Sequence, residues 1–331
     1  MDNNTQVKER VLLWDNLKFI MILFVVLGHI VQYYQGTDSC RSMLLFVLLV
    51  HMPAFMFVTG LFSKNSIKNR RYDRVIGFFA IYIVTKIVIY VSQRICRQEV
   101  GFSLLTESGV PWFAFSIGVF FLVTMAVSNC KKVYVLVISI LLACFVGYDS
   151  AVNDYLVLAR TITFFPYFYL GYCLNQDDVL RFTKKMPVKI ISAVIVIATA
   201  IICILFLDET WWMSTILFAP FNNIAHAEWA WALRFFRYIV GLVLILAFIS
   251  LTPNKKLPLI TDMGGRTIQV FVLHRPFIYL WFGFNMDQYV QMFMPNHWKY
   301  FSVFVFGGLL TLVLSTKRLS GIFHWLQNPR K

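Results

Sequence analysis

Residues 12–32 read LLWDNLKFIMILFVVLGHIVQ, an apolar run that is interrupted by a lysine at position 18 and a histidine at position 29. A helix needs about 20 mostly apolar residues to cross the hydrocarbon core of a bilayer. This run is too long for the core of a secretory signal peptide, and no small-residue cleavage site follows it. We therefore expect it to be retained as the first membrane helix.

The composition extends this expectation to the whole chain. Of the 331 residues, 59% are hydrophobic and 14% charged, and the mean hydropathy is +0.69. Soluble domains carry roughly a quarter charged residues, so the bilayer is the solvent that fits. We expect an all-α, polytopic integral membrane protein of about ten transmembrane helices, forming a single domain over residues 1–331. The expected spans are 12–32, 42–62, 75–92, 111–128, 133–148, 159–175, 188–207, 230–252, 267–284 and 299–316.

Basic residues give the expected orientation, because lysine and arginine accumulate in cytoplasmic loops. They concentrate in 1–11, 63–74, 129–132, 176–187, 253–266 and 317–331 and are few in the alternate loops. Both termini are then cytoplasmic, in a multi-pass protein of the cell membrane, here the bacterial inner membrane. The net charge is +14, but the basic residues do not gather on one face with aromatic residues between them. We therefore expect membrane lipid around the chain and no nucleic acid as a partner.

The six cysteines are scattered along the sequence. None of them forms a CxxC pair or a Cys/His spacing of the kind that binds zinc. Neither a disulfide framework nor a metal site is expected, and buried packing is the simpler interpretation of these residues.

Polar side chains within expected spans are costly and usually face a cavity or a partner. Lys18 and His29 are eleven positions apart, which is about three helical turns plus 20°, so both lie on one helix face about 16 Å apart along the axis. The second span holds His51 and then Pro53, which tends to kink a helix, followed by Gly60, which permits close helix contact. A lone intramembrane histidine is most simply a packing residue. His29 and His51 are expected at matched depth, and His274 is a third histidine within a span. Together, the three are explained equally well by packing and by a chemical role.

A basic stretch, RRYDR at residues 70–74, follows the second span. Positive-inside topology explains it adequately. The functional alternative is that Arg70, Arg71 and Arg74 grip phosphates of a nucleotide-bearing donor, since arginine forks suit phosphate.

Taken in order, these pieces resemble the acyltransferase-3 family of membrane O-acyltransferases. Within it, they look most like the fucose 4-O-acetylase-like and intercellular-adhesion polysaccharide-modifying branch. The matching segments run over most of the chain. They are Lys18 with His29, HMPAFMFVTG at 51–60, the arginines of 70–74, PWF at 111–113, Arg160 with FFPYF at 164–168, and GRT at 265–267 leading to His274. Phe271 stands where the family usually has tyrosine, so a role for that hydroxyl is absent.

The resemblance implies transfer of an acetyl or other short acyl group from cytoplasmic acyl-CoA to a sugar hydroxyl. His29 would act as the base or as a transient acyl carrier, Lys18 would hold the donor at the inner mouth, and His51 would assist His29. Histidine suits a base because its ordinary pKa of about 6.5 leaves it neutral yet able to take a proton.

The same resemblance distributes the binding roles. Arg70, Arg71 and Arg74 would contact the phosphates of acetyl-CoA, which is a donor substrate and not a permanently bound cofactor. Arg160 and His274 would position the acceptor, a sugar or polysaccharide that is free or lipid-linked. A separate acyl-accepting or glycan-assembly protein would be the remaining partner.

Three other classes of protein share parts of this pattern. A proton-coupled transporter, or an exporter of a glycan or lipid-linked intermediate, would also carry intramembrane histidine and arginine. Transporters of this kind often show inverted halves, and the Lys18/His29 pattern has no counterpart after residue 165. A glycan polymerase or ligase would concentrate polar groups in a large external loop, and a scaffold leaves the membrane-depth histidines unexplained.

Overall fold

The computed structural model describes residues 11–107, 109–218, 220–221, 227–292 and 299–327. Across these residues the secondary structure is helical, apart from an isolated antiparallel bridge between Thr106 and Tyr155. The all-α prediction is confirmed for this part of the chain. The elements in order are α1 (Leu13–Val31), η1 (Gln32–Tyr34), α2 (Asp38–Lys68), α3 (Tyr72–Ile95), α4 (Trp112–Ala126), α5 (Lys132–Phe145), η2 (Val146–Tyr148), α6 (Leu158–Cys173), α7 (Gln176–Thr183), α8 (Met186–Leu205), α9 (Leu207–Thr210), α10 (Trp212–Thr215), η4 (Ala227–Trp229), α11 (Ala230–Leu251), α12 (Ile260–Gly264), α13 (Thr267–Gly283), α14 (Met286–Met292), α15 (Lys299–Leu314) and α16 (Lys317–Gln327).

Within the described residues, five helical segments are long and apolar enough to cross a membrane: Leu13–Tyr34, Asp38–Lys68, Tyr72–Ile95, Met186–Leu205 and Ala227–Leu251. Five of the ten expected spans coincide with these segments. The other five fall on α4, α5, α6, α13 and α15, which have 14 to 17 residues each. The total of ten therefore stays a prediction. So does the orientation, because the chain ends at 1–10 and 328–331 lie outside the described residues.

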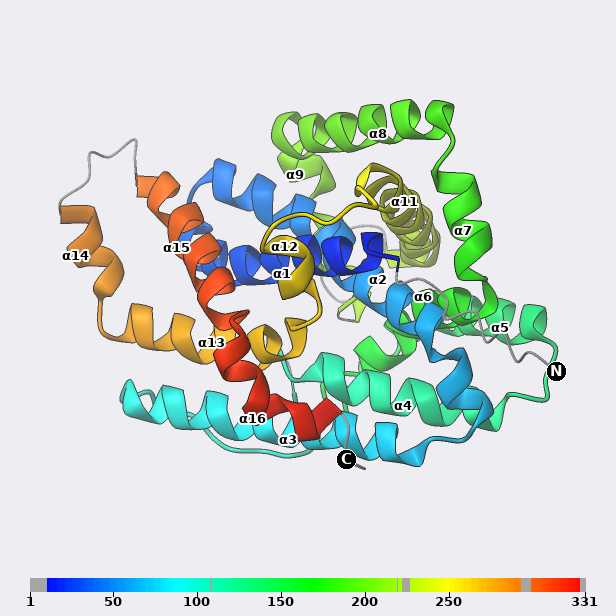
Figure 1. Ribbon diagram of the computed structural model, residues 1–331, viewed down its shortest axis with the longest axis horizontal. Coiled ribbons are helices and arrows are strands. Elements are labelled where there is room, and N and C mark those ends of the chain that lie inside the picture. The colour runs from blue at the N-terminus through cyan, green and yellow to red at the C-terminus, as the bar shows by residue number, and fades with distance from the viewer. Residues whose placement is uncertain (1–10, 108, 219, 222–226, 293–298, 328–331) are drawn as a thin grey trace, which may run out of the picture.

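The helices surround α1 and α2. Figure 1 shows α1 crossing the middle of the molecule, with α3 along one edge and α8 along the opposite edge. In the most apolar 18-residue stretch of α2, 78% of the residues are buried inside the molecule, against 11% in the corresponding stretch of α8. An apolar helix with so little internal burial needs an apolar solvent. A helix that faces lipid has such a solvent.

Two glycines allow α2 and α6 to touch backbone to backbone. A Cβ added to Gly60 would overlap the carbonyl oxygen of Phe168, and one added to Gly171 would overlap the carbonyl oxygen of Phe57. This reciprocal contact bears out the sequence prediction of a close helix approach at Gly60.

The start of α1 is held by the segment that precedes α12. The side-chain amide nitrogen of Asn16 donates to the carbonyl of Pro253 at 2.8 Å and to that of Lys255 at 3.0 Å. The amide oxygen of Asn16 accepts from the hydroxyl of Thr261 at 2.6 Å. Asn16 is fully buried, and its bonds hold the end of α1 that carries Lys18 against α12 and the loop before it.

Candidate functional site

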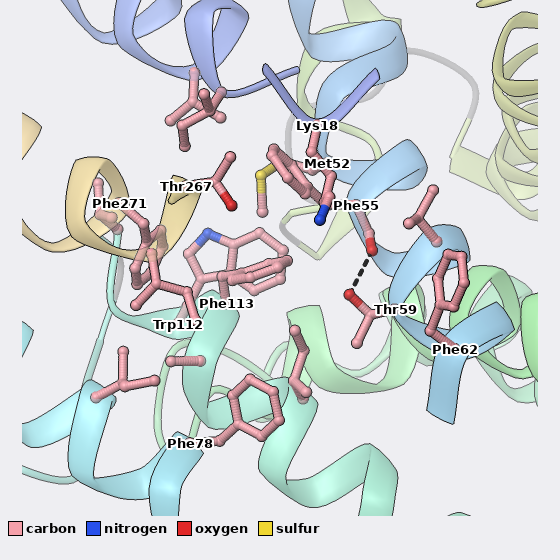
Figure 2. Close-up of a pocket in the computed structure, with 18 of the residues that line it drawn as sticks. Lys18, Met52, Phe55, Thr59, Phe62, Phe78, Trp112, Phe113, Thr267 and Phe271 are labelled. Carbon is pink, nitrogen blue, oxygen red and sulfur yellow. Dashed lines mark hydrogen bonds between the residues drawn. The ribbon is translucent and has the colours of Figure 1, made fainter. Parts of the chain in front are cut away.

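A cavity of about 480 Å³, called here the central cavity, opens between α1, α2, α3, α4 and the start of α13. Its wall is mostly aromatic and aliphatic, a lining that disfavours water. Figure 2 shows Lys18 directed into it, across from the rings of Trp112 and Phe113. Its polar side chains are Lys18, His29, Thr59, Ser63, Ser66, Arg74 and Thr267.

Lys18 and His29 both line the central cavity, so the face of α1 that they share is the face that forms this wall. The ammonium of Lys18 lies 2.9 Å from the carboxylate of Asp15, one turn earlier, and its side chain is 31% exposed. Asp15 is itself buried. A cation that is paired on one side and partly exposed on the other can still contact an anionic ligand.

A contact between Nδ1 and Gln32 orients the ring of His29. Nδ1 lies 3.2 Å from the amide oxygen of Gln32, and the guanidinium of Arg275 donates to that same oxygen at 3.5 Å and to the carbonyl of His29 at 3.4 Å. An amide oxygen only accepts hydrogen bonds, so Nδ1 carries the proton and Nε2 keeps its lone pair. His29 is therefore arranged as a base on its Nε2 side.

His274 lies directly behind His29. The two rings stack with centroids 5.3 Å apart and 27° between their planes. The Nδ1 of His274 contacts the carbonyl of Val270 at 2.8 Å, while its buried Nε2 has no hydrogen-bond partner among the described residues. The side chain is completely buried and is not part of the central cavity wall.

His51 is buried on another side of α2 and does not line the central cavity. Its Nδ1 contacts the carbonyl of Val47 at 2.6 Å. Nearby, Arg237 from α11 donates to the carbonyls of Leu48 and Leu49 at 2.9 and 3.1 Å. These bonds to backbone oxygens tie α2 to α11, and they place His51 next to a structural arginine and away from the cavity.

The three arginines of 70–74 are separated by the structure. Arg74 lines the central cavity. Arg71 forms an ion pair with Asp73 at 2.6 Å, and this hydrogen bond raises the pKa of Arg71 above its ordinary value. Arg70 is exposed, has a positive φ of 46° and does not line the cavity. Of the three, only Arg74 is placed to meet a ligand in the central cavity.

Arg160 lies behind one wall of that cavity. Its guanidinium is 5.6 Å from the ring centre of Trp112 and 5.4 Å from that of Phe218. It also lies 3.6 Å from the carboxylate of Asp154. Since Trp112 lines the cavity and Arg160 does not, any effect of Arg160 on a ligand there would pass through the indole.

Two further cavities adjoin the central one. The first, of about 410 Å³, shares Val110 with it and is lined by Gln93, Arg275, Tyr279 and the buried Lys86–Glu107 ion pair, whose atoms are 2.6 Å apart. The second, called here the basic cavity, measures about 680 Å³ and shares Gly265 with the central cavity. It is lined by Leu12, Lys256, Thr261, Asp262, Gly265, Arg266 and Lys317.

Gln32 and Arg275 belong to the site, although the sequence motifs predict no role for them. The spacing of three residues from His29 to Gln32 places both on one side of a helix, and that signal could have identified Gln32. Arg275 approaches from α13, so no local pattern near His29 points to it. Among the described residues, no group of three or more His, Cys, Asp or Glu side chains could hold a metal ion.

Comparison with known proteins gives a family match over almost the whole chain. The model of the acyltransferase-3 family, described as an acyltransferase domain, matches residues 12–316. The polysaccharide-modifying branch within it stays a prediction.

Two curated relatives are nodulation proteins NolL. The one from Mesorhizobium japonicum is 23% identical over 214 residues, which cover 59% of this chain and 56% of the relative. The one from Sinorhizobium fredii is 24% identical over 213 residues, with the same shares. The chain thus spans little more than half the length of these relatives. No solved structure matches.

Proposed function

The chain belongs to the acyltransferase-3 family, and on that premise we propose that it is a membrane O-acyltransferase. It moves an acetyl or other short acyl group from cytoplasmic acyl-CoA to a hydroxyl of a cell-surface or exopolysaccharide sugar. The observation that carries this proposal is His29, whose Nε2 side is left as a proton acceptor in a largely apolar cavity that also contains Lys18.

The reaction needs a base for the acceptor hydroxyl. Nε2 of His29 takes the hydroxyl proton as the sugar oxygen attacks the thioester carbonyl. The tetrahedral intermediate then collapses, the carbon–sulfur bond breaks, and the imidazolium returns its proton to the departing thiolate. The products are the sugar ester and free CoA. If His29 instead carried the acyl group transiently, Nε2 would attack the thioester carbonyl and release the CoA thiolate. The sugar hydroxyl would then attack the acyl group on Nε2 and give its proton to that thiolate, which restores neutral His29.

The apolar wall supports this chemistry because water competes with the sugar for the thioester. Rings such as Trp112, Phe113 and Phe271 leave little for water to bind, so an acyl donor there would be protected from hydrolysis. Lys18 and Arg74 supply positive charge on the same wall and would contact the donor's phosphates.

Four residues that the resemblance placed in the site would act through a neighbouring residue and not by contact with a substrate. His274 stacks on His29 and would help to fix its ring beside the sugar. Arg160 would act through Trp112. His51 would be a positioning residue, since it bonds to Val47, whose side chain packs 3.3 Å from where a Cβ on Gly28 would stand. Arg71 would support the inner mouth through Asp73.

Mass spectrometry of the surface polysaccharide, from cells with and without the gene, tests the reaction. We expect the glycan to lose the mass of one acyl unit per modified residue in the deletion strain and to regain it on complementation. A proton-coupled exporter predicts another result, in which the amount of surface glycan falls while its acyl content stays constant. That result would refute the acyltransferase proposal.

A further inference from the structure

The donor proposed above carries a phosphorylated nucleotide, and the central cavity offers it few polar contacts. Its cations are Lys18, already paired with Asp15, and Arg74. A nucleotide diphosphate transferred into an apolar, mostly aromatic cavity would lose hydration without compensation. The nucleotide therefore needs a second, more polar place that is continuous with the first.

The basic cavity has the charge for this role. Lys256, Arg266 and Lys317 line it with one carboxylate, that of Asp262, so its charged side chains carry a net excess of two positive charges. The Nε of Arg266 donates to the carbonyl of Ser315 at 2.6 Å. That bond holds the guanidinium in place and leaves its terminal nitrogens for an anion.

Two helices begin at this cavity. Arg266 is the N-cap residue of the 17-residue α13, and Lys317 is the first residue of the 11-residue α16. The N-terminus of a helix carries partial positive charge and unpaired backbone N–H groups. Their field adds to that of the three basic side chains and favours phosphate.

The basic cavity also borders the central cavity. Gly265 lines both cavities, and the next residue but one, Thr267, lines the central cavity. Because glycine has no side chain, only the backbone of Gly265 stands between the two cavities at this position. The bonds of Asn16 to Thr261 and to the carbonyl of Lys255 hold α12, which ends just before Gly265, against the start of α1, two residues before Lys18.

We infer that the basic cavity binds the nucleotide phosphates of the acyl-CoA donor, and that the thioester arm passes Gly265 into the central cavity toward His29. This assignment rests on the proposed function and deepens it. It adds Lys256, Arg266 and Lys317 to Lys18 and Arg74 as the cations that contact the donor's phosphates, in place of Arg70 and Arg71, which line neither cavity.

Two donors that differ in the nucleotide provide the test. Acetyl-CoA carries the phosphorylated adenosine, and acetyl-4′-phosphopantetheine lacks it. Purified full-length protein would be assayed for thiol release with each donor, using surface polysaccharide from the gene-deletion strain as acceptor. Lys256→Glu and Lys317→Glu reverse charge at exposed positions, so the fold should persist. Lys255→Glu is the matched control, since Lys255 is also exposed but does not line the cavity.

We expect Lys256→Glu and Lys317→Glu each to raise the KM for acetyl-CoA about tenfold, which corresponds to roughly 1.4 kcal/mol. The KM for acetyl-4′-phosphopantetheine should stay within about twofold of the wild-type value, and Lys255→Glu should resemble the wild type. An equal rise for both donors, no rise for either, or an equal effect of Lys255→Glu would overturn the assignment.

A binding measurement separates this inference from the proposed function. CoA should raise the melting temperature of the wild-type protein and of His29→Ala, and should do so less for Lys256→Glu. Thermal stabilisation by CoA that depends on Lys256, in a wild-type protein that releases no thiol, would support the nucleotide site and remove the reaction. Equal stabilisation of wild type and Lys256→Glu would remove the nucleotide site.

Discussion

The imidazole of His274 stacks on the imidazole of His29, with ring centroids 5.3 Å apart and 27° between the ring planes. The two residues are 245 positions apart in the sequence and come from α1 and α13. Each has its Nδ1 engaged, His29 with Gln32 and His274 with the carbonyl of Val270. The pair therefore presents Nε2 atoms as its available nitrogens, and only His29 lines the central cavity.

His29→Ala should abolish acyl transfer. General-base catalysis contributes about 10²–10⁴-fold to rate, so we expect at least a hundredfold loss of acylated glycan in complemented cells. Immunoblotting of the membrane fraction should show an unchanged amount of protein. Full acylation by this variant would exclude His29 from the mechanism.

Gln32→Leu should lower turnover about tenfold, equal to roughly 1.4 kcal/mol in the barrier, because the ring of His29 loses the acceptor that fixes its tautomer. Gln32→Glu keeps an acceptor oxygen and should retain most of the activity. The two variants are compared by kcat at saturating acyl-CoA. Equal kcat values for both would show that the Gln32 contact does not orient the base.

Lys18→Arg should be tolerated better than Lys18→Ala or Lys18→Glu, because the proposed role of Lys18 is contact with an anion. We expect a KM for acyl-CoA near the wild-type value for arginine, about tenfold higher for alanine, and higher again for glutamate, which also repels Asp15. Initial rates over a range of acyl-CoA concentrations measure this order. An identical KM in all three variants would contradict the role.

Arg74→Ala and Arg70→Ala should differ, although the two residues belong to one basic stretch. Arg74 lines the central cavity and Arg70 does not, so the KM for acyl-CoA should rise severalfold in Arg74→Ala, as expected when about 1 kcal/mol of charge-assisted contact is lost. Arg70→Ala should resemble the wild type in the same assay. A larger effect at position 70 would mean that the donor enters along another path.

Gly60→Ala should destabilise the fold by about 1–3 kcal/mol, the usual effect of overpacking, because its methyl group would overlap the carbonyl of Phe168. Gly308→Ala is the control, since a Cβ there meets nothing within 4 Å. The melting temperature of each variant in detergent measures the difference. Equal melting temperatures would show that α2 and α6 separate at no cost.

The sequence predicts those parts of the site that depend on one helix. The eleven-residue spacing of Lys18 and His29 is enough to place both on one face, because helical geometry is regular. The close contact at Gly60 follows from the same kind of local argument. The stacking of His274 on His29 and the approach of Arg275 to Gln32 depend on how α13 packs on α1, which no local period specifies.

The basic cavity is a second feature that the sequence alone does not predict. Its cations come from 256, 266 and 317, and in each segment the charges read adequately as topology signals. Only the folded chain brings them to one place. The expected spans at α4, α5, α6, α13 and α15 are longer than the helices found there, because the apolar runs continue beyond the helix ends, as the run of α5 continues into η2.

The two side cavities meet the central cavity at opposite ends of α1. The basic cavity includes Leu12, just before the helix begins, and the cavity beyond Val110 includes Arg275, which bonds to Gln32 just after the helix ends. The 19 residues of α1, about 28 Å of helix, lie between these two cavities. If donor and acceptor each use the nearer one, spent CoA would leave on one side without obstructing the arrival of sugar on the other, and neither substrate would need to wait for the other's exit.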